Sequence, residues 1–405
     1  MENVMKIGFK DDSFAFELVR NLGFIYYGGA DLGDMMATAE QITEGDFESW
    51  YVNWHARGER VATRAGDYLA AGHENSARES FLRASTYFRM AEFYLHGNPS
   101  DPRILQESRA SREAYAKAAE LTGPTWEPIE IPYEGTTLPG YFYKVDDSDQ
   151  PRPTLIFHGG YDSSIEELFY YGGAAAIRRG YNCLTFDGPG QGRPLREQQL
   201  VFRHDWENVV SPAVDYALSR RDVDGDRLAL KGLSLGGYLA ARAAAFEPRF
   251  KAAIFFDGVY SLYDSLRGVL SSHVLDAFDA EDASRFNELV GKEMQTNTQL
   301  RWTFDQGVFS FGSNSFYDFV VSTQKMMLDG GVAERITCPT LVMEADGDQF
   351  FRGQPQHVFS ALRSPKAFAR FTDEDGAENH CQSGALAYKD EVAFNWLDDT
   401  LRGNQ

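Results

Sequence analysis

The 405 residues of the chain exceed the usual size of one compact domain, so we expect two domains or one large domain with an insertion. The formal net charge of −21 repels phosphate backbones and anionic lipids, which argues against nucleic-acid and membrane-surface partners. Hydrophobic residues make up 43% of the chain and aromatic residues 14%, enough for a full core and for a ring-lined pocket that binds a small molecule.

Three scattered cysteines, Cys183, Cys338 and Cys381, are too few for a disulfide framework or a zinc cluster. No metal-binding motif occurs either, so we expect neither a metal nor a cofactor. The first residues lack the apolar run of a signal peptide, and no stretch of the chain approaches 18 consecutive apolar residues. These features predict a cytoplasmic protein.

Residues 1–125 carry a helical pattern and are expected to form a separate lobe. We expect one helix within residues 40–70 and a second behind Ser76–Glu79, which has the form of a capping box. A third helix begins at Asp101-Pro102, since proline is favoured in the first turn. The lobe either only packs on the rest of the chain, roofs an active site, or forms the contact of a homodimer.

From residue 126 onward, short β-type runs alternate with segments long enough for helices. The first two runs flank a hairpin turn at 134–137, and the eight predicted strands are 129–133, 138–145, 154–157, 182–186, 228–230, 252–256, 340–343 and 367–371. This alternation predicts an α/β fold with a mostly parallel sheet covered by helices. The core is expected over 126–258 and 337–405, with residues 259–336 inserted as a helical, ring-rich cap.

Ser234 lies in a Gly-x-Ser-x-Gly motif between a strand and an alanine-rich helix. On such a turn the serine hydroxyl is pushed out of the sheet, and small neighbours are needed because the turn is crowded. The helix that follows places backbone N–H groups beside a developing oxyanion. The motif alone is common by chance, but this strand–turn–helix context predicts that Ser234 is a nucleophile and not part of a plain tight turn.

A serine at its ordinary pKa needs an oriented base, and in this kind of fold the partners follow in the order serine, acid, histidine. Asp348 ends an acidic turn after the seventh predicted strand, and we prefer it to Asp346 or Glu344 as the acid. Among the eight histidines, His380 follows the acid in a loop after the last predicted strand. We therefore predict that His380 is the base and that Cys381 beside it is a buried small residue.

Two backbone N–H groups are expected to form an oxyanion hole. One belongs to Leu235, and the other to Gly160 or Tyr161 in the loop after the third predicted strand, where glycines let the backbone approach a carbonyl. His158 at the start of that loop is expected to shape it. The glycine-rich turn at 187–192 is expected to line the same crevice. It is not expected to bind phosphate, because it lacks the Lys-Ser/Thr ending of a phosphate loop.

Taken together, these motifs resemble a branch of the α/β-hydrolases that contains 2,6-dihydroxypseudooxynicotine hydrolase, the fermentation-respiration switch proteins and fungal polyketide-pathway hydrolases of the pigment-shortening type. The shared features are the helical segment 76–93, the loop His158-Gly-Gly-Tyr-Asp162 with Glu166-Glu167, the turn Asp187-Gly-Pro-Gly-Gln-Gly192, Gly-Leu-Ser234-Leu-Gly-Gly, and Gly376-Ala-Glu-Asn-His380-Cys381. The likeness covers about residues 45–400.

The resemblance implies an α/β-hydrolase fold and hydrolysis of a carbon–carbon bond next to a ketone, or of an ester or lactone, in a bulky and often aromatic small molecule. It also implies an acidic substrate contact, for which Asp257, Asp264 and Glu166 are candidates. The chain departs from the branch at Ser163-Ser164, where a glycine is common, and this difference is expected to alter the pocket rim.

Other functions fit the same residues. With the same three residues the enzyme would act as an acyltransferase or form lactones, if the cap excludes water and admits an alcohol. A non-catalytic binding protein on this scaffold is a second alternative, against which the Ser–Asp–His order argues. An aminopeptidase would need an acidic anchor for the substrate amine, and none stands out.

Overall fold

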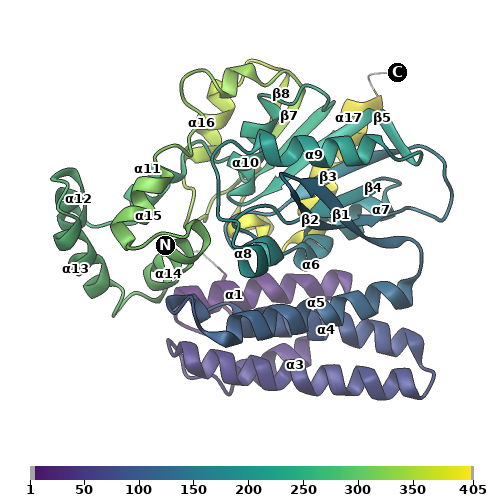
Figure 1. The fold of residues 1–405 in the computed structure, drawn as a ribbon, viewed down its shortest axis with the longest axis horizontal. Coiled ribbons are helices and arrows are strands. Elements are labelled where there is room, and N and C mark those ends of the chain that lie inside the picture. Colours follow the sequence, from purple (N-terminus) through teal and green to yellow (C-terminus); the bar gives the residue numbers. More distant parts are fainter. Residues whose placement is uncertain (1–4, 403–405) are drawn as a thin grey trace.

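The computed structural model describes residues 5–402 and contains one eight-stranded sheet, helices on its faces, and a layer of helices along one side (Figure 1). The strands are β1 (Trp126–Tyr133), β2 (Thr136–Tyr143), β3 (Arg152–His158), β4 (Asn182–Phe186), β5 (Val223–Leu233), β6 (Ala252–Phe256), β7 (Thr340–Ala345) and β8 (Lys366–Phe371). Their order across the sheet is β1-β2-β4-β3-β5-β6-β7-β8. All eight predicted strands are present, and the predicted α/β class is confirmed.

Only β2 runs against the other seven strands. β1 and β2 form the expected hairpin, β2 pairs antiparallel with β4, and every further pairing from β4 to β8 is parallel. Strands β4, β6 and β7 are buried along their whole length, as expected for parallel strands covered on both faces. The carboxyl ends of β3, β5, β6, β7 and β8 therefore meet at one edge of the sheet, where loops can share a crevice.

Helices cover both faces of the sheet. Those of the core are α6 (Ile165–Leu168), α7 (Ala174–Arg178), α8 (Gly192–Gln198), α9 (Glu207–Leu218), α10 (Gly236–Ala244), α16 (Gln354–Ala361) and α17 (Leu386–Arg402). Helix α10 packs on β5 and β6, and α9 lies beside it in front of the sheet, whereas α17 packs behind (Figure 1). The alanines of α10 allow this close packing, because Ala240, Ala241 and Ala243 are fully buried.

The N-terminal helices lie together below the sheet (Figure 1). They are α1 (Asp12–Gly23), α2 (Leu32–Ala39), α3 (Phe47–Ala70), α4 (Glu74–Glu92) and α5 (Pro102–Thr122). Helix α5 starts as predicted, with the Asp101 side chain accepting from the N–H of Arg103. The capping box predicted at Ser76–Glu79 is wrong, because α4 already begins at Glu74 and this tetrapeptide lies inside the helix.

The segment between β6 and β7 is helical throughout most of its length. It contains α11 (Leu262–Val269), α12 (Ser272–Asp279), α13 (Ala283–Glu293), α14 (Thr298–Phe311) and α15 (Phe316–Thr323). A short antiparallel bridge between Ser261 and Met327 joins its two ends. Helix α14 contacts both α1 and the short helix η2 (Leu95–Gly97), so the inserted segment and the N-terminal helices meet over the sheet edge.

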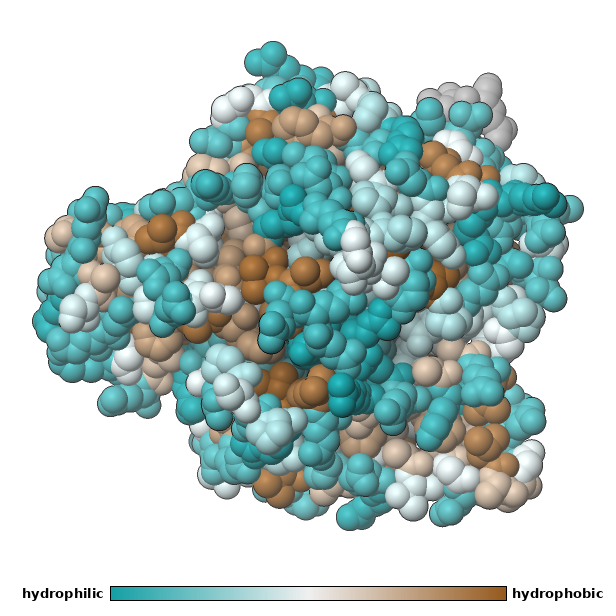
Figure 2. All heavy atoms as spheres, in the orientation of Figure 1, coloured by the Kyte–Doolittle hydropathy of each residue, from teal (hydrophilic) through white to brown (hydrophobic). Residues whose placement is uncertain are grey.

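The face of the molecule seen in Figure 2 is largely hydrophilic. Apolar residues gather on it where the inserted helices and the N-terminal helices border the sheet domain, among other places. Within residues 5–402, no helix has the length and apolar character needed to cross a membrane.

Candidate active site

Ser234 occupies the sharp turn between β5 and α10. Its backbone has φ of 61°, a left-handed conformation that is strained for a residue with a side chain and typical of a nucleophile elbow. The N–H of Ser234 donates to the Phe256 carbonyl of β6 at 2.6 Å, which fixes the turn against the sheet. Gly237 is required there, because a Cβ at this position would lie 1.7 Å from the backbone oxygen of Asp257.

The structure brings Ser234, His380 and Asp348 into one hydrogen-bonded chain. Nε2 of His380 lies 2.9 Å from Oγ of Ser234, and Nδ1 lies 2.8 Å from Oδ2 of Asp348. The other oxygen of Asp348 accepts from the N–H groups of Phe350 and Phe351 at 2.7 and 3.0 Å. A base oriented by an acid and touching a serine hydroxyl is the arrangement that activates a nucleophile.

The two alternative acids point elsewhere. Asp346 pairs with the exposed guanidinium of Arg370, and Glu344 contacts the side-chain amide of Gln356. Both carboxyl groups thus have partners other than His380.

The electrostatics of the site favour a charged His380–Asp348 pair. Burial by itself would lower the pKa of His380, but the neighbouring carboxylates of Asp348 and Asp257 outweigh it and raise this pKa well above its ordinary value. Burial would likewise raise the pKa of Asp348, yet His380 and the two backbone N–H donors hold it below its usual range. The two carboxylates therefore make Nε2 of the neutral ring a stronger proton acceptor, as a general base requires.

Asp257 does not contact the pocket, which corrects its prediction as a substrate contact. It directly follows β6, is fully buried, and places Oδ2 2.9 Å from Nδ1 of His380. The same oxygen accepts from the backbone N–H of Cys381 at 3.2 Å and from its thiol at 3.3 Å. Asp257 thus contacts the loop that carries His380 and does not line the pocket.

The loop after β3 packs directly on the serine elbow. A Cβ on Gly160 would lie 2.8 Å from the backbone nitrogen of Leu235, so only glycine allows this approach. The N–H of Gly160, one of the two predicted oxyanion donors, is already used by the Ser163 hydroxyl at 2.9 Å. The candidate hole is therefore formed by the N–H groups of Leu235 and Tyr161, and Ser163, at the position that departs from the branch, decides between them.

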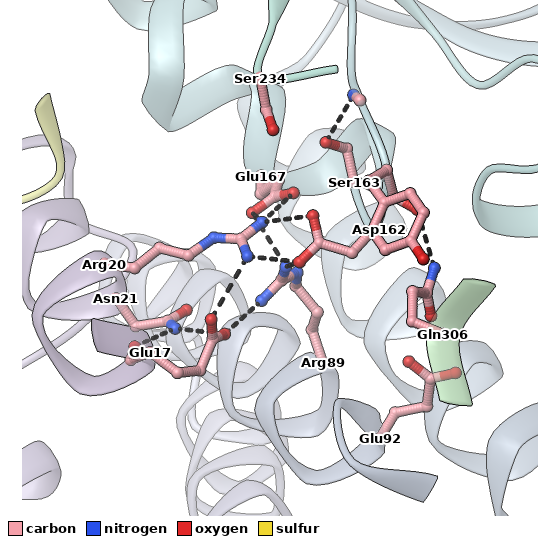
Figure 3. A network of polar contacts seen from close by, with 12 residues as sticks. Glu17, Arg20, Asn21, Arg89, Glu92, Asp162, Ser163, Glu167, Ser234 and Gln306 are labelled. Carbon is pink, nitrogen blue, oxygen red and sulfur yellow. Dashed lines mark hydrogen bonds and ion pairs between the residues drawn. The ribbon is translucent and has the colours of Figure 1, made fainter. Parts of the chain in front are cut away.

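Two further contacts from the inserted helices hold this loop. Nε2 of Gln306 in α14 donates to the backbone oxygen of Tyr161 at 2.8 Å (Figure 3), and the Tyr161 hydroxyl donates to the Thr303 carbonyl at 2.6 Å. From the core, Nε2 of Gln191 donates to the Gly160 carbonyl at 3.0 Å. The turn at 187–192 thus supports the loop from the core, and α14 holds the Tyr161 peptide from the inserted segment.

A buried ionic cluster connects the same loop to the N-terminal helices (Figure 3). Arg20 of α1 binds Asp162 at 2.6 Å and Glu167 at 2.8 Å, and Arg89 of α4 binds Glu17 at 2.9 Å and Glu167 at 3.3 Å. Two guanidinium groups thus face three carboxyl groups, and the exposed fraction of each of the five side chains is 10% or less. Buried ion pairs keep their geometry because breaking one leaves an uncompensated charge.

A pocket of about 260 Å³ opens in front of Ser234 between the sheet edge, α1, α11 and α14. Six aromatic side chains line it, namely Phe16, Tyr161, Tyr171, Trp302, Phe350 and Phe351. Leu262, Leu266 and Val269 of α11 add an aliphatic wall. The lining surface is mainly apolar, although the charged residues Lys6, Asp12, Arg20 and Asp162 also border it, so the pocket suits a largely apolar, ring-containing ligand that carries some polar groups.

Two predicted substrate contacts lie outside this pocket. Asp264 is exposed on the outer face of α11, because Leu262, Ser265 and Leu266 turn the opposite face inward. Glu166 is buried behind the loop after β3, where it lines a small separate cavity with Asp187. The predictions for both residues are wrong, since neither side chain reaches the space in front of Ser234.

Several residues near the site were not indicated by the sequence motifs. Nζ of Lys231 and Nζ of Lys389 both donate to the backbone oxygen of Tyr171, at 3.0 and 2.7 Å, which fixes that wall of the pocket. Burial lowers the pKa of Lys231 to about 7. The sequence did contain a signal for Lys231, since a lysine inside an apolar strand, three residues before the serine, is unusual. His158 shapes its loop as predicted, with Nδ1 3.1 Å from the Gly159 carbonyl, and burial lowers its pKa to about 4.

Among residues 5–402, one group of side chains could hold a metal ion, and it consists of Asp257, His380 and Cys381. The ligand atoms of these three residues lie within 4.8 Å of one another. A metal there would take over a ring nitrogen of His380 that already contacts Ser234 or the two acids. The donor set therefore fits the serine–histidine chain better than an ion.

The fold and this site together define an α/β-hydrolase. A crystal structure of 2,6-dihydroxy-pseudo-oxynicotine hydrolase has the same fold, with a TM-score of 0.74 and 23% identity over 95% of this chain and 97% of that chain. AbyA5 also shares the fold, with a TM-score of 0.62 and 18% identity over 93% and 95% of the two chains. Both similarities extend over the N-terminal helices and the inserted helices as well as the sheet domain.

The chain belongs to the FrsA-like esterase family, because the model of that family, Esterase FrsA-like, matches residues 45–290. Hydrolase LUC6 of a Fusarium species is 38% identical over 97% of both chains. The 20-hydroxy-prefusarin hydrolase FUS2 of Gibberella moniliformis is 36% identical, again over 97% of both. The resemblance expected from the motifs is thereby confirmed, and the chain is a member of a hydrolase family.

Proposed function

We propose that this protein is a serine hydrolase in which Ser234, activated by His380 and Asp348, attacks a bulky, ring-containing small molecule of polyketide type. The observation that carries the proposal is the hydrogen-bonded chain from Asp348 through His380 to Ser234, which ends in a pocket lined by aromatic rings. The hydrolases of similar sequence support the reaction class, and one of them is named for its action on 20-hydroxy-prefusarin.

In the proposed reaction, His380 takes the proton of Ser234 at Nε2 while Oγ attacks a substrate carbonyl. The N–H groups of Leu235 and Tyr161 stabilise the oxyanion, and Asp348 stabilises the imidazolium. The tetrahedral intermediate then collapses, and His380 gives its proton to the leaving group. Water, activated by the same histidine, releases the acyl group from Ser234 and restores the free enzyme.

The bond that breaks is a carbon–carbon bond next to a ketone, or an ester or lactone bond. For the carbon–carbon case the leaving group is a carbanion, so the substrate itself must delocalise the charge, as a 1,3-dicarbonyl compound or an electron-rich ring does. A mainly apolar pocket lined by six aromatic rings fits such a molecule.

Labelling with a fluorophosphonate and product analysis test the proposal. Wild-type protein should be labelled at Ser234, and Ser234→Ala should lose labelling and turnover of aryl 1,3-diketones or lactones by more than about a thousandfold. Ser265→Ala is the matched control, because Ser265 lines the same pocket but donates to the Ser261 carbonyl at 2.8 Å.

Full turnover by a clean preparation of Ser234→Ala would contradict the proposal. Products that carry an added alcohol in place of water would show acyl transfer by the same three residues.

A further inference from the structure

His380 has two acids on the same ring nitrogen. Nδ1 lies 2.8 Å from Oδ2 of Asp348 and 2.9 Å from Oδ2 of Asp257. The two acids follow neighbouring parallel strands, β7 and β6, whose carboxyl ends meet at the same sheet edge. A single serine–histidine–acid chain needs only one of them, so the second carboxyl group calls for a physical explanation.

We propose that Asp257 is a second acid of this site, a positioning residue that shares Nδ1 of His380 with Asp348 and can orient the ring alone. The inference rests on the proposed function, because it concerns the same base. It assigns to Asp257 an action through His380, without contact to the substrate.

Burial of Asp257 is otherwise poorly compensated. Within the described chain, Oδ1 has no hydrogen-bond partner, and Oδ2 has only the N–H and thiol of Cys381 besides His380. A buried carboxyl group with so few donors costs free energy unless a cation is beside it. The cation available to Asp257 is the protonated His380, which forms when the ring takes the proton of Ser234.

The two acids differ in how they are held. Asp348 receives two backbone N–H groups and the well-aligned hydrogen bond from His380, which stabilise its anion. Asp257 is less well solvated, and its pKa is raised, first by burial and further by Asp348. Asp348 therefore orients the ring at rest, and Asp257 adds a second negative charge that favours the protonated ring.

Few other titratable groups face Asp257. They are His380 and Cys381 from the loop after β8, Asp348 from the loop after β7, and Glu344 within β7. Burial and Asp257 raise the pKa of the Cys381 thiol to about 12, so the thiol stays neutral and acts as a donor. A change in the pH profile on removing Asp257 therefore reports on His380.

The rate of fluorophosphonate labelling of Ser234, followed from about pH 5 to 9, tests the proposal without knowledge of the substrate. In Asp257→Asn, loss of one negative charge beside His380 should lower the pKa of the ring and move the acidic limb of the profile to lower pH. Asp346→Asn is the matched control, because Asp346 pairs with exposed Arg370 and not with His380. Its limb should stay in place.

A second comparison tests whether Asp257 can orient the His380 ring when the Asp348 carboxylate is absent. Asp348→Ala should keep a labelling rate at least about tenfold above that of Asp348→Ala/Asp257→Asn, since residues that act as a unit are not additive. Asp348→Ala/Asp346→Asn should match Asp348→Ala. If Asp257→Asn unfolds, a different measurement is made on Asp348→Ala. The downfield proton NMR signal of the His380 Nδ1–H group should persist in that variant, because Asp257 still accepts from it.

Equal rates of the Asp348→Ala and Asp348→Ala/Asp257→Asn variants, an unmoved acidic limb in Asp257→Asn, or loss of the Nδ1–H signal in Asp348→Ala would overturn the proposal. Failure of the proposed function has a different signature, because wild-type protein would then not be labelled at Ser234 at all.

Discussion

Arg20 and Asp162 join the first helix of the chain to the loop beside the candidate nucleophile, with 2.6 Å between Nη1 and Oδ2. Asp162 immediately follows Tyr161, whose N–H is the second candidate oxyanion donor. The N-terminal helices are thus tied to the backbone that would stabilise an oxyanion, and Phe16 and Arg20 of α1 line the pocket. Of the three roles expected for the lobe, this contact supports a roof over the site.

Replacing Asp162 by Asn should therefore damage both stability and reactivity. Arg20 would lose its shortest ion pair inside a buried cluster, which should lower the free energy of unfolding by about 2–4 kcal/mol. Displacement of the Tyr161 N–H should reduce kcat/KM or the labelling rate by about 10–100-fold. Denaturant unfolding and labelling kinetics measure the two effects. Asp67→Asn, at an exposed position of α3 outside the pocket, should change neither.

Removal of the contact from α14 should act on kcat more than on KM. Gln306→Leu keeps the size of the side chain but abolishes the bond to the Tyr161 carbonyl, so the peptide carrying the candidate donor can rotate. A several-fold loss in kcat with KM nearly unchanged is expected, since the loss concerns the transition state. Gln324→Leu, at an exposed position just after α15 and outside the pocket, is the control. Equal kinetics for both variants would show that the contact does not hold the loop.

The glycine that follows the serine motif should tolerate no side chain. Gly237→Ala would place its Cβ 1.7 Å from the Asp257 carbonyl, so the backbone of the elbow must shift, at a cost of more than about 2 kcal/mol. Gly291→Ala on α13 meets no atom within 4 Å and should stabilise the protein by about 0.5–1 kcal/mol. Thermal unfolding of the two variants should shift in opposite directions.

The buried His158 predicts a defined pH dependence of stability. Its pKa is lowered from 6.5 to about 4 by burial, so the unfolded chain binds the proton more readily than the folded chain between these values. The contribution to stability is therefore complete above about pH 6.5 and is lost as the pH falls toward 4. In His158→Gln the free energy of unfolding should fall less steeply over this window than in the wild type. Identical slopes would contradict the shift.

The candidate nucleophile, base and acid could be located from the sequence because each follows the end of a strand. The order of Ser234, Asp348 and His380 along the chain reflects the order in which parallel strands bring loops to one edge. The outward position of Asp264 could also have been inferred from the sequence, since Leu262, Ser265 and Leu266 recur at the helical spacing of one inward face.

Other contacts depended on tertiary docking and could not be predicted. Arg20 and Asp162 are 142 residues apart, and no local pattern relates a helix near the N-terminus to a loop of the sheet domain. Asp257 was found as an acid after a strand, but its direction depends on how the later loop with Cys381 folds over it. Ser163 decides which N–H group remains free, and that choice requires the turn geometry.

The loop from Gly160 to Ser163 is held by residues from α1, α14 and the core, and these segments are distant in the sequence. In the proposed mechanism, a chain whose helical regions have not yet docked would expose the serine without a fixed partner amide, and so would lack activity. Reactivity of Ser234 therefore reports complete folding of the whole polypeptide. Selection for turnover in a mutant library would at the same time select for correct assembly of all its parts.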